Sequence, residues 1–444
     1  MTDPHHAPRR AVGTAGRRRA RRAAGAVLTV GALSLAGCAP ADETPVLTWY
    51  TNPDDGGQAA LAEACTQEAD GAYRIETSLL PNEASSQREQ LTRRLAAGDT
   101  SMDIMSLDPP FIPELAEPGF LAPVPDDVQQ QASEGTLEGA LAGATWKDTL
   151  VTVPFWANTQ LLWYRKSVVE EAGLDMDGPV TWEQIIEVAR SQDKDLGVQG
   201  ARAEPITVWL NALIESAGGQ ILENPEAPAD QVELGLDTDA GRAAAEVIGT
   251  IGQEGLGGPG LPTQAENESM LLFQGDNGSF MVNWPFVWPA TNASVEEGAL
   301  PESLIEDIGW TTYPRMNADD PAAPPLGGIN LGVGASSEHH ELAFDAIQCI
   351  TTPEHQAEYF VTNGNPPAHE EAYADPRLEE DFPMAPVIRE SLDLATPRPQ
   401  TPYYNEVSTA IQQRFTPPSA VDPETTPAQT GQFITDVLRG EALL

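Results

Sequence analysis

Three polar side chains lie where predicted strands end or the next helix begins. Asn52 follows the first predicted strand, Gln87 opens the second predicted helix, and Asp108 follows the third predicted strand. Amide and carboxylate groups can each satisfy two hydrogen-bonding groups of a ligand, so this set favours the binding of a polar molecule. Each residue also has an ordinary structural alternative, because Asn52 and Asp108 can serve turns and Gln87 can be an exposed first-turn residue.

An alternation of predicted strands and helices positions these side chains. We expect strands at residues 46–50, 73–80 and 103–107, and helices at residues 58–69 and from Ser85 or Ser86 to residue 97. Short loops between such elements predict a parallel sheet with right-handed crossovers. Ligands bind such sheets beyond the carboxyl ends of the strands, which is where the three polar side chains lie.

A stretch of mixed aromatic and polar residues at 153–166 indicates a change of packing. It places Asn158 and Gln160 among aromatic residues and then continues as an apolar run. We interpret it as a chain that crosses from one packed unit to another, with its amides free to face a cleft. The alternative is an ordinary buried strand with flanking aromatic residues.

The second half of the chain alternates predicted helices with Pro- and Gly-rich loops. Thr181 and Gln184 have the spacing of a capping box at the start of a helix. Further helices are expected at residues 208–217, 341–350, 353–360, 386–394, 404–415 and 431–438, and a strand at residues 278–284. Arg398 lies in a loop stiffened by prolines, where a basic residue is unusual in so acidic a chain.

Length and charge exclude several classes of protein. The 444 residues suffice for two or three domains' worth of core. A net charge of −43, from 24 basic and 67 acidic side chains, excludes nucleic-acid binding, which needs clustered Lys and Arg. The acidity indicates a solvated surface and does not identify a ligand.

The N-terminus has the pattern of an export signal. A cluster of arginines between Arg17 and Arg22 precedes a short apolar run at residues 23–35, and the sequence Leu-Ala-Gly before Cys38 resembles a bacterial lipobox. We therefore expect a signal peptide at residues 1–37, lipidation of Cys38 and a linker at residues 38–45. An uncleaved membrane anchor is the alternative, and the pattern leaves the Sec and twin-arginine export routes open.

The other two cysteines, Cys65 and Cys349, form an even set in an exported chain. This favours one disulfide, with two buried free thiols as the alternative. Other chemistry lacks its motifs: the pair His339 and His340 has no metal ligands at motif spacing, and the glycines at 327–334 lack the Lys of a phosphate loop. We expect no metal and no cofactor.

These pieces together resemble family 1 extracellular solute-binding proteins, which are related to maltose-binding proteins. The likeness covers residues 46–444, and its most specific segments are 146–166, 178–183, 327–333 and 352–356. More narrowly, residues 154–158, 283–285 and 396–399 resemble the actinobacterial trehalose-binding lipoproteins.

The resemblance implies an α/β fold, the two-lobed periplasmic-binding-protein fold of type II (maltose-binding-like), with a hinge that the chain crosses three times. The crossings are expected near residues 153–157, 314–325 and 364–368. Lobe 1 would then comprise residues 46–153 and 325–364, and lobe 2 residues 154–324 and 365–444.

The resemblance also implies a ligand site in the cleft between the lobes. Its residues would be Asn52, Gln87, Asp108, Asn158, Glu266, Trp284, Gly327, Gly328, Arg398 and Tyr403. Amides and carboxylates suit sugar hydroxyls, and flat aromatic rings suit the apolar faces of a sugar. Glu268 remains an alternative to Glu266, and Tyr404 shares the aromatic segment of Tyr403. Arg398 could fork two hydroxyls or pair with a cleft carboxylate that accepts from the sugar.

The function implied by the resemblance is that of a binding protein without enzymatic activity. It would be a lipid-anchored monomer on the extracytoplasmic face of the cell membrane that binds a disaccharide, trehalose first, and delivers it to an ABC permease. The alternatives are a secreted carbohydrate-active enzyme, or a receptor for another α-glucoside or for a non-sugar solute such as a peptide or polyamine.

Overall fold

Two β-sheets organise residues 44–444, which are the residues that the structure, a computed structural model, describes. The expected signal peptide and Cys38 lie outside the described residues. In spatial order, the strands of the first sheet are β2 (Arg74–Leu79), β1 (Val46–Thr51), β3 (Ile104–Leu107), β11 (Leu326–Gly332) and β6 (Val153–Thr159). Those of the second sheet are β10 (Ile308–Thr311), β7 (Leu161–Arg165), β9 (Gly278–Asn283) and β8 (Asp195–Gly197).

The first sheet confirms the predicted parallel arrangement of the first three strands. Strand β1 pairs in parallel with both β2 and β3, through the helices α1 (Gly57–Glu68) and α2 (Ala84–Ala96), whereas β11 is antiparallel to β3 and β6. Trp49 and Phe155 pack edge to face in its core. Ser85 and Ser86 do not cap α2, whose first turn follows Glu83 without a side-chain cap.

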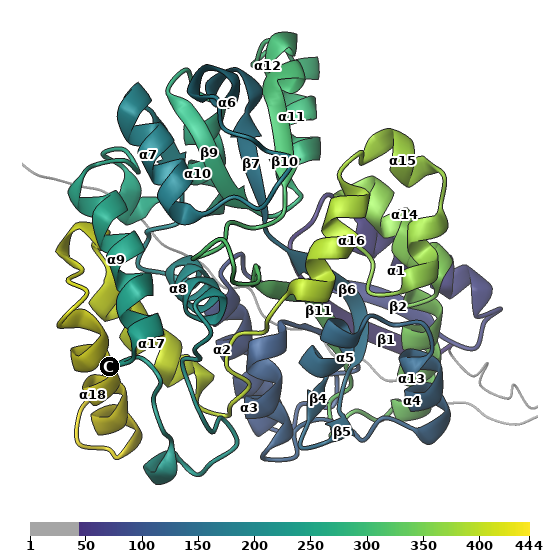
Figure 1. The fold of residues 1–444 in the computed structure, drawn as a ribbon. Coiled ribbons are helices and arrows are strands. Elements are labelled where there is room, and N and C mark those ends of the chain that lie inside the picture. Colours follow the sequence, from purple (N-terminus) through teal and green to yellow (C-terminus); the bar gives the residue numbers. More distant parts are fainter. Residues whose placement is uncertain (1–43) are drawn as a thin grey trace, which may run out of the picture. The chain divides into compact units, whose positions relative to one another are not determined.

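Helices of the first lobe cover this sheet and surround its edge (Figure 1). They are α3 (Ile112–Ala116), α4 (Asp126–Ser133), α5 (Glu138–Gly143), α13 (His340–Ile350) and α14 (Pro353–Asn363). Cys65 of α1 and Cys349 of α13 form a disulfide, so both ends of this bond belong to the first lobe. No helix among residues 44–444 is both long enough and apolar enough to cross a membrane.

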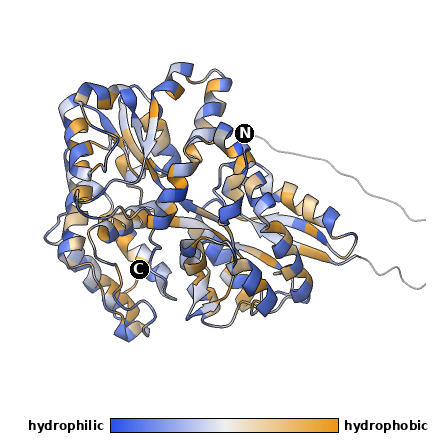
Figure 2. Ribbon diagram, turned by 45° about the vertical axis from the view of Figure 1, so that its right-hand side comes forward, coloured by the Kyte–Doolittle hydropathy of each residue, from blue (hydrophilic) through white to orange (hydrophobic). Residues whose placement is uncertain are grey.

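The second sheet lies among the helices of the second lobe. These are α6 (Lys166–Ala172), α7 (Trp182–Gln192), α8 (Glu204–Ser216), α9 (Asp239–Gln253), α10 (Glu266–Gln274), α11 (Val287–Glu296), α12 (Glu302–Asp307), α17 (Tyr404–Phe415) and α18 (Thr426–Leu438). The capping box of Thr181 and Gln184 is present at the start of α7. Hydrophobic residues follow the strands and the helix sides that face them, and hydrophilic residues cover the outer turns (Figure 2).

Helix α8 is unusual because it is buried on nearly every side. Almost all of its residues from Pro205 to Ser216 are buried, which explains a sequence that is apolar around the whole helix. It begins at Glu204, four residues before the predicted start at residue 208. The N-terminus of a rigid, buried helix thereby comes to lie at the cleft.

The chain passes between the two sheets at places that differ in part from those expected. Strand β6 pairs with β11 as far as Thr159, and β7 joins the second sheet from Leu161, so the first passage lies at Gln160 and not at residues 153–157. The apolar run is continuous through this segment, so the sequence does not show where the first sheet ends. The backbone pairing of β6 and β7 determines that point. The second passage falls between β10 and β11.

The third passage lies at residues 396–403 and not at residues 364–368. Residues 366 and 367 pair with β6, and α16 (Ala385–Leu394) packs against β6 and α5. Thr396 then forms a bridge with Pro325, after which α17 enters the core of the second lobe. The segment around α15 (Arg377–Asp381) also reaches the second lobe, since the Trp288 indole donates to the Asp381 carbonyl at 3.0 Å.

Candidate functional site

The first lobe presents its polar side chains at the carboxyl edge of the parallel strands. Asn52 follows β1, and its Nδ2 donates to Gln87 Oε1 at 2.7 Å. Gln87 Nε2 in turn donates to the Pro81 carbonyl at 2.8 Å. Asn52 Oδ1 is buried and has no hydrogen-bond partner among residues 44–444. The two amides therefore orient each other and leave one acceptor for a ligand.

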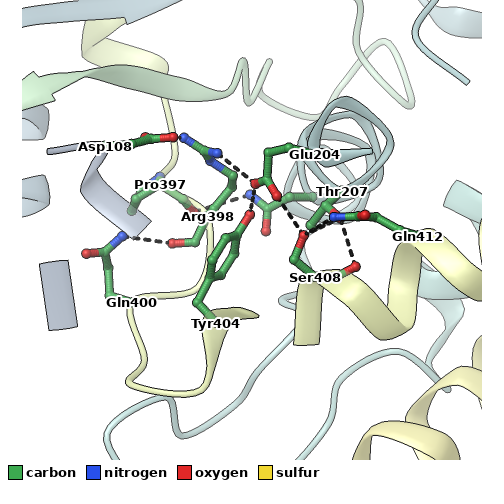
Figure 3. Close-up of polar contacts among 10 residues, drawn as sticks. Asp108, Glu204, Thr207, Pro397, Arg398, Gln400, Tyr404, Ser408 and Gln412 are labelled. Atoms are coloured by element: carbon green, nitrogen blue, oxygen red, sulfur yellow. Dashed lines mark hydrogen bonds and ion pairs between the residues drawn. The ribbon is translucent and has the colours of Figure 1, made fainter. Parts of the chain in front are cut away.

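Arg398 connects the two lobes from the third passage. Its side chain is 4% exposed, one Nη lies 2.7 Å from Asp108 Oδ1, and the other lies 2.8 Å from Glu204 Oε1 (Figure 3). Asp108 follows β3 in the first lobe, and Glu204 opens α8 in the second. One guanidinium thus bridges carboxylates from both sides of the cleft. Each of its two Nη groups donates a charge-assisted hydrogen bond to a different carboxylate.

Glu204 is held by a second set of contacts in the second lobe. Its Oε1 also accepts from the Tyr404 hydroxyl, and its Oε2 accepts from Ser408 Oγ at 2.7 Å (Figure 3). Ser408 Oγ lies 2.9 Å from Thr207 Oγ1 of α8. Helices α8 and α17 therefore fix the carboxylate, and the carboxylate fixes the guanidinium.

Burial and charge act in opposite directions on this cluster. Burial raises the pKa of Asp108, and the Arg398 guanidinium only partly offsets it. Burial alone would lower the pKa of Arg398, but the charges of Asp108 and Glu204, with the hydrogen bond to Glu204, hold it well above its ordinary value. Arg398 therefore stays charged, and its two carboxylates compensate that charge inside the protein.

Two glycines of β11 allow close packing opposite Asn158 of β6. A Cβ at Gly327 would lie 2.9 Å from two atoms of the Trp284 ring, so any larger residue would displace the indole. Gly328 has a φ of +120°, which a residue with a side chain rarely adopts. Trp284 follows β9 of the second lobe, and its ring lies directly over the first sheet at this point.

The structure distinguishes Glu266 from Glu268. Glu268 Oε2 accepts from the Ala265 amide at 3.1 Å and serves the first turn of α10. The carboxylate of Glu266 accepts no bond from another side chain among the described residues. Burial raises the pKa of Glu266, and the charges of Glu83, Glu204 and Glu268 add to the effect. Both residues line the cavity, and Glu266 is the more buried of the two.

All the residues expected to bind a ligand, except Tyr403, line one cavity of about 550 Å³ between the lobes. Tyr403 lies elsewhere, because its hydroxyl accepts from the Ala229 amide at 3.1 Å. Its neighbour Tyr404 is buried beneath Arg398 and does not line the cavity either. Contact of the nine other residues with a ligand stays a prediction.

Glu204 and Trp156 are among several further cavity residues that were not expected from the sequence. Glu204 was missed because the helix was predicted to begin four residues later, although the pair Glu204-Pro205 is typical of a first helical turn. Trp156 also lines the cavity, where sequence alone indicated a buried aromatic residue. Neither has a local motif that predicts ligand contact.

A larger hollow of about 840 Å³ lies on the outer side of the second lobe, between α6, α7 and α9. It is lined by no residue of the first sheet and by none of Arg398, Asp108 and Glu204. Among the described residues, the cluster of Cys65, Cys349 and His355 is close enough to hold a metal, but its two sulfur atoms are bonded to each other. We therefore place the candidate site in the cavity between the lobes.

The lining of this cavity is suited to binding a polar ligand. It combines amide and carboxylate groups, the indole of Trp284 and the largely buried ring of Trp156 within one space. Such a lining matches a ligand that has many hydroxyl groups and apolar ring faces.

Comparison with solved structures shows the same fold. Maltose-bound MalE3 of T. maritima superposes with a TM-score of 0.74 at 24% identity, covering 89% of this chain and 100% of that one. A solute-binding protein of Agrobacterium radiobacter in complex with ribitol gives a TM-score of 0.72 at 18% identity, covering 89% and 99%. The predicted maltose-binding-like, two-lobed fold is confirmed.

Sequence relatives lead to the same group of proteins. A probable ABC transporter-binding protein of Deinococcus radiodurans is 24% identical over 75% of this chain and 78% of its own length. A maltotriose-binding protein of Pyrococcus abyssi is 23% identical over 68% and 62%. The pattern of one family, described as bacterial extracellular solute-binding protein, matches residues 53–357, more than half of the chain. The protein therefore belongs to the family of bacterial extracellular solute-binding proteins.

Proposed function

We propose that the protein binds an uncharged disaccharide, trehalose first, between its lobes and delivers it to the membrane subunits of an ABC importer. The observation that carries this proposal is the single cavity of about 550 Å³ lined by residues of both lobes. Its volume is in the range of sites for small molecules. The resemblance of residues 154–158, 283–285 and 396–399 to trehalose-binding lipoproteins supports the choice of sugar.

The contacts within the cavity suggest how a sugar would be held. Asn52 Oδ1 has no partner among residues 44–444 and could accept from a hydroxyl, and Arg398 pairs with Oδ1 of Asp108, which leaves its Oδ2 to accept from another. The Trp284 ring offers an apolar surface. Arg398 has both Nη groups in ion pairs, so we assign it the role of orienting Asp108 and not of forking the sugar itself.

Ligand binding would couple to closure of the lobes. The chain passes between the sheets twice and then returns to the helices of the second lobe at residues 396–403, where Arg398 ties Asp108 of the first lobe to Glu204 of the second. A ligand that contacts both walls favours the closed state by its differential affinity, and the closed state would be the one that the permease binds.

No chemical reaction on the sugar is expected. The carboxylates of Asp108 and Glu204 are both engaged by Arg398 and do not form a free acid–base pair. Incubation of the protein with trehalose or maltose should release no glucose. Enzyme-dependent glucose release would support the carbohydrate-active enzyme instead.

Thermal unfolding with a panel of sugars tests the proposal directly. Trehalose at about 100 times its Kd should stabilise the folded state by about 2.7 kcal/mol and raise Tm accordingly. Trp284→Ala should lose this response, while Trp288→Ala, which changes a tryptophan outside the cavity, should retain it. A flat response of the unaltered protein to trehalose, maltose and mannitol would contradict the ligand class.

The proposed place of the protein is the outer face of the cell membrane, as a monomer anchored through lipid at Cys38. This rests on the lipobox-like motif, which lies outside the described residues. Mass spectrometry of the mature N-terminus should find Cys38 with its acyl chains, because stable anchoring needs two or more of them. Cys38→Ala should prevent the modification, and an unmodified Cys38 in the membrane fraction would contradict the anchor.

A further inference from the structure

A second cavity, of about 300 Å³, lies beside the third passage. Residues 396–400 form one side of it, and Glu215 at the end of α8 with residues 220–225 form the other. Arg398 lines both this cavity and the candidate site. Val208 of α8 lines the candidate site, and seven residues along a helix span about 10 Å, so the two cavities are neighbours along α8.

Several polar groups of this short segment lack hydrogen-bond partners. Thr396 Oγ1, Arg398 Nε and Gln400 Oε1 are buried and have no partner among residues 44–444. Arg398 is the most buried of the three residues, at 4% exposure. A buried polar group without a partner is costly to the folded state, so three of them along one cavity indicate that something else supplies the missing bonds.

Glu215 adds a fourth polar group on the opposite side. Its carboxyl has no hydrogen-bond partner among the described residues, and burial, with the nearby charge of Glu223, raises its pKa to about 7. Near neutral pH this group can therefore either donate or accept a hydrogen bond.

The remaining walls are apolar and rigid. Ile221 and Leu222 are buried, and Pro225, Pro397 and Pro399 contribute flat, stiff surfaces. One donor, one acceptor and a hydroxyl next to apolar walls match a ligand that carries adjacent hydroxyl groups on a ring. A cation would meet Arg398 and an anion would meet Glu215 and Glu223, so a neutral molecule fits best.

We propose that the cavity between residues 396–400 and the end of α8 is a second binding site, for one neutral hydroxylated ring such as a monosaccharide. It is separate from the candidate site and does not depend on the identity of the ligand there. Arg398 lines both sites.

Calorimetric titration with D-glucose tests this site in the unaltered protein and four variants. Thr396→Val removes the unpaired hydroxyl and keeps the shape of the side chain, while the Thr396 backbone bonds to residues 324 and 326 remain. Glu215→Met removes the acid from the same cavity without adding a charge. Thr92→Val is the matched control, because Thr92 Oγ1 is also buried without a partner but lies on α2, outside both cavities. Trp284→Ala disables the candidate site.

We expect glucose to bind the unaltered protein, Thr92→Val and Trp284→Ala with similar affinity. Thr396→Val and Glu215→Met should each weaken glucose binding about fivefold, the effect of one lost hydrogen bond. Loss of glucose binding in Trp284→Ala alone would place the sugar in the candidate site and overturn the proposal. Absence of saturable binding in all five proteins would show that the second cavity holds ordered water only.

Trehalose titrations of the same proteins separate this proposal from the proposed function. Trehalose binding should be lost in Trp284→Ala and kept in Thr396→Val. If trehalose fails to bind any of them while glucose behaves as expected, the second site stands and the ligand proposed for the first is wrong.

Discussion

The two walls of the candidate site hold their polar side chains by different means. On the first-lobe wall, Asn52 and Gln87 are neutral, lie 35 residues apart and bond directly to each other. On the opposite wall, Arg398 pairs with Glu204, 194 residues away, and it also reaches across the cleft to Asp108 of the first lobe, 290 residues away. One wall is a local amide pair and the other is a buried ionic cluster assembled by the tertiary fold.

The difference assigns separate roles to the two walls. A hydrogen bond between neutral amides contributes little net free energy when water can replace one partner. Such amides can therefore exchange one hydrogen-bond partner for a ligand. A buried ion cluster is costly to form and more costly to leave incomplete, so it favours one fixed geometry. We therefore expect the first wall to govern affinity and the second to govern stability.

The largest effect should come from removal of the guanidinium. Arg398→Ala leaves Asp108 and Glu204 buried without compensation and should lower the free energy of unfolding by about 3–5 kcal/mol, measured by urea denaturation. Arg377→Ala is the control, because Arg377 pairs with Asp375 and Glu358 at the surface and should cost less than about 1 kcal/mol. Equal small losses in both variants would remove the distinction between the walls.

A glycine substitution tests the contact at which the walls meet. Gly327→Ala places a Cβ 2.9 Å from the Trp284 ring, so the indole must move. Sugar affinity should fall about tenfold, or about 1.4 kcal/mol, in calorimetric titration. Gly298→Ala is unsuitable as a control because of its positive φ, whereas Gly178→Ala has open space around it and should leave affinity unchanged. Unchanged affinity in Gly327→Ala would show that the position of the ring does not matter.

The amide wall should respond in the opposite sense to the ionic wall. Gln87→Ala removes the bonds to Asn52 and Pro81 and should cost only about 1 kcal/mol of stability, while sugar affinity drops because Asn52 loses its orientation. Gln67→Ala, which removes an exposed bond to Glu63, should affect neither quantity. A large loss of stability with intact affinity would reverse the assigned roles.

The smallest effect concerns pH. The pKa of Glu266 is raised by burial and by neighbouring carboxylates, so the folded protein holds this proton at a pH where the unfolded chain has lost it. Stability should therefore fall as pH rises above the ordinary carboxyl range. Glu266→Gln should remove this decline and add about 0.5–1 kcal/mol at pH 8, after allowance for partial exposure. Glu268→Gln should leave the decline in place; if it abolishes the decline, Glu268 is the buried acid.

The residues of the amide wall could be predicted from the sequence because they follow local signals. Asn52 comes directly after a strand whose composition predicts it, as does Asp108 of the ionic cluster, and parallel strands bring their carboxyl ends to one edge. The fold class followed from the same alternation and from the resemblance to maltose-binding proteins.

The residues of the ionic wall could be predicted from the sequence only in part. Arg398 was noticed as a base in a stiff loop, but Glu204 depends on where α8 begins, and apolar periodicity is weakest at a helix end. Neighbouring residues at a helix start point about 100° apart, so Tyr403 and Tyr404 face different surroundings. The sequence does not indicate which of the two faces the cleft. Packing places Tyr404 on Glu204 and Tyr403 on Ala229.

The bond between Cys65 and Cys349 closes a covalent ring of the backbone, with a sequence separation of 284 residues. Every strand of the second sheet lies inside this ring, from β7 to β10. A protease that cuts one surface loop there, such as the acid-rich loop at residues 223–231, would leave the two fragments joined. The nicked protein should migrate as one band on a non-reducing gel and as two after reduction, so a single cut within the ring need not release either piece.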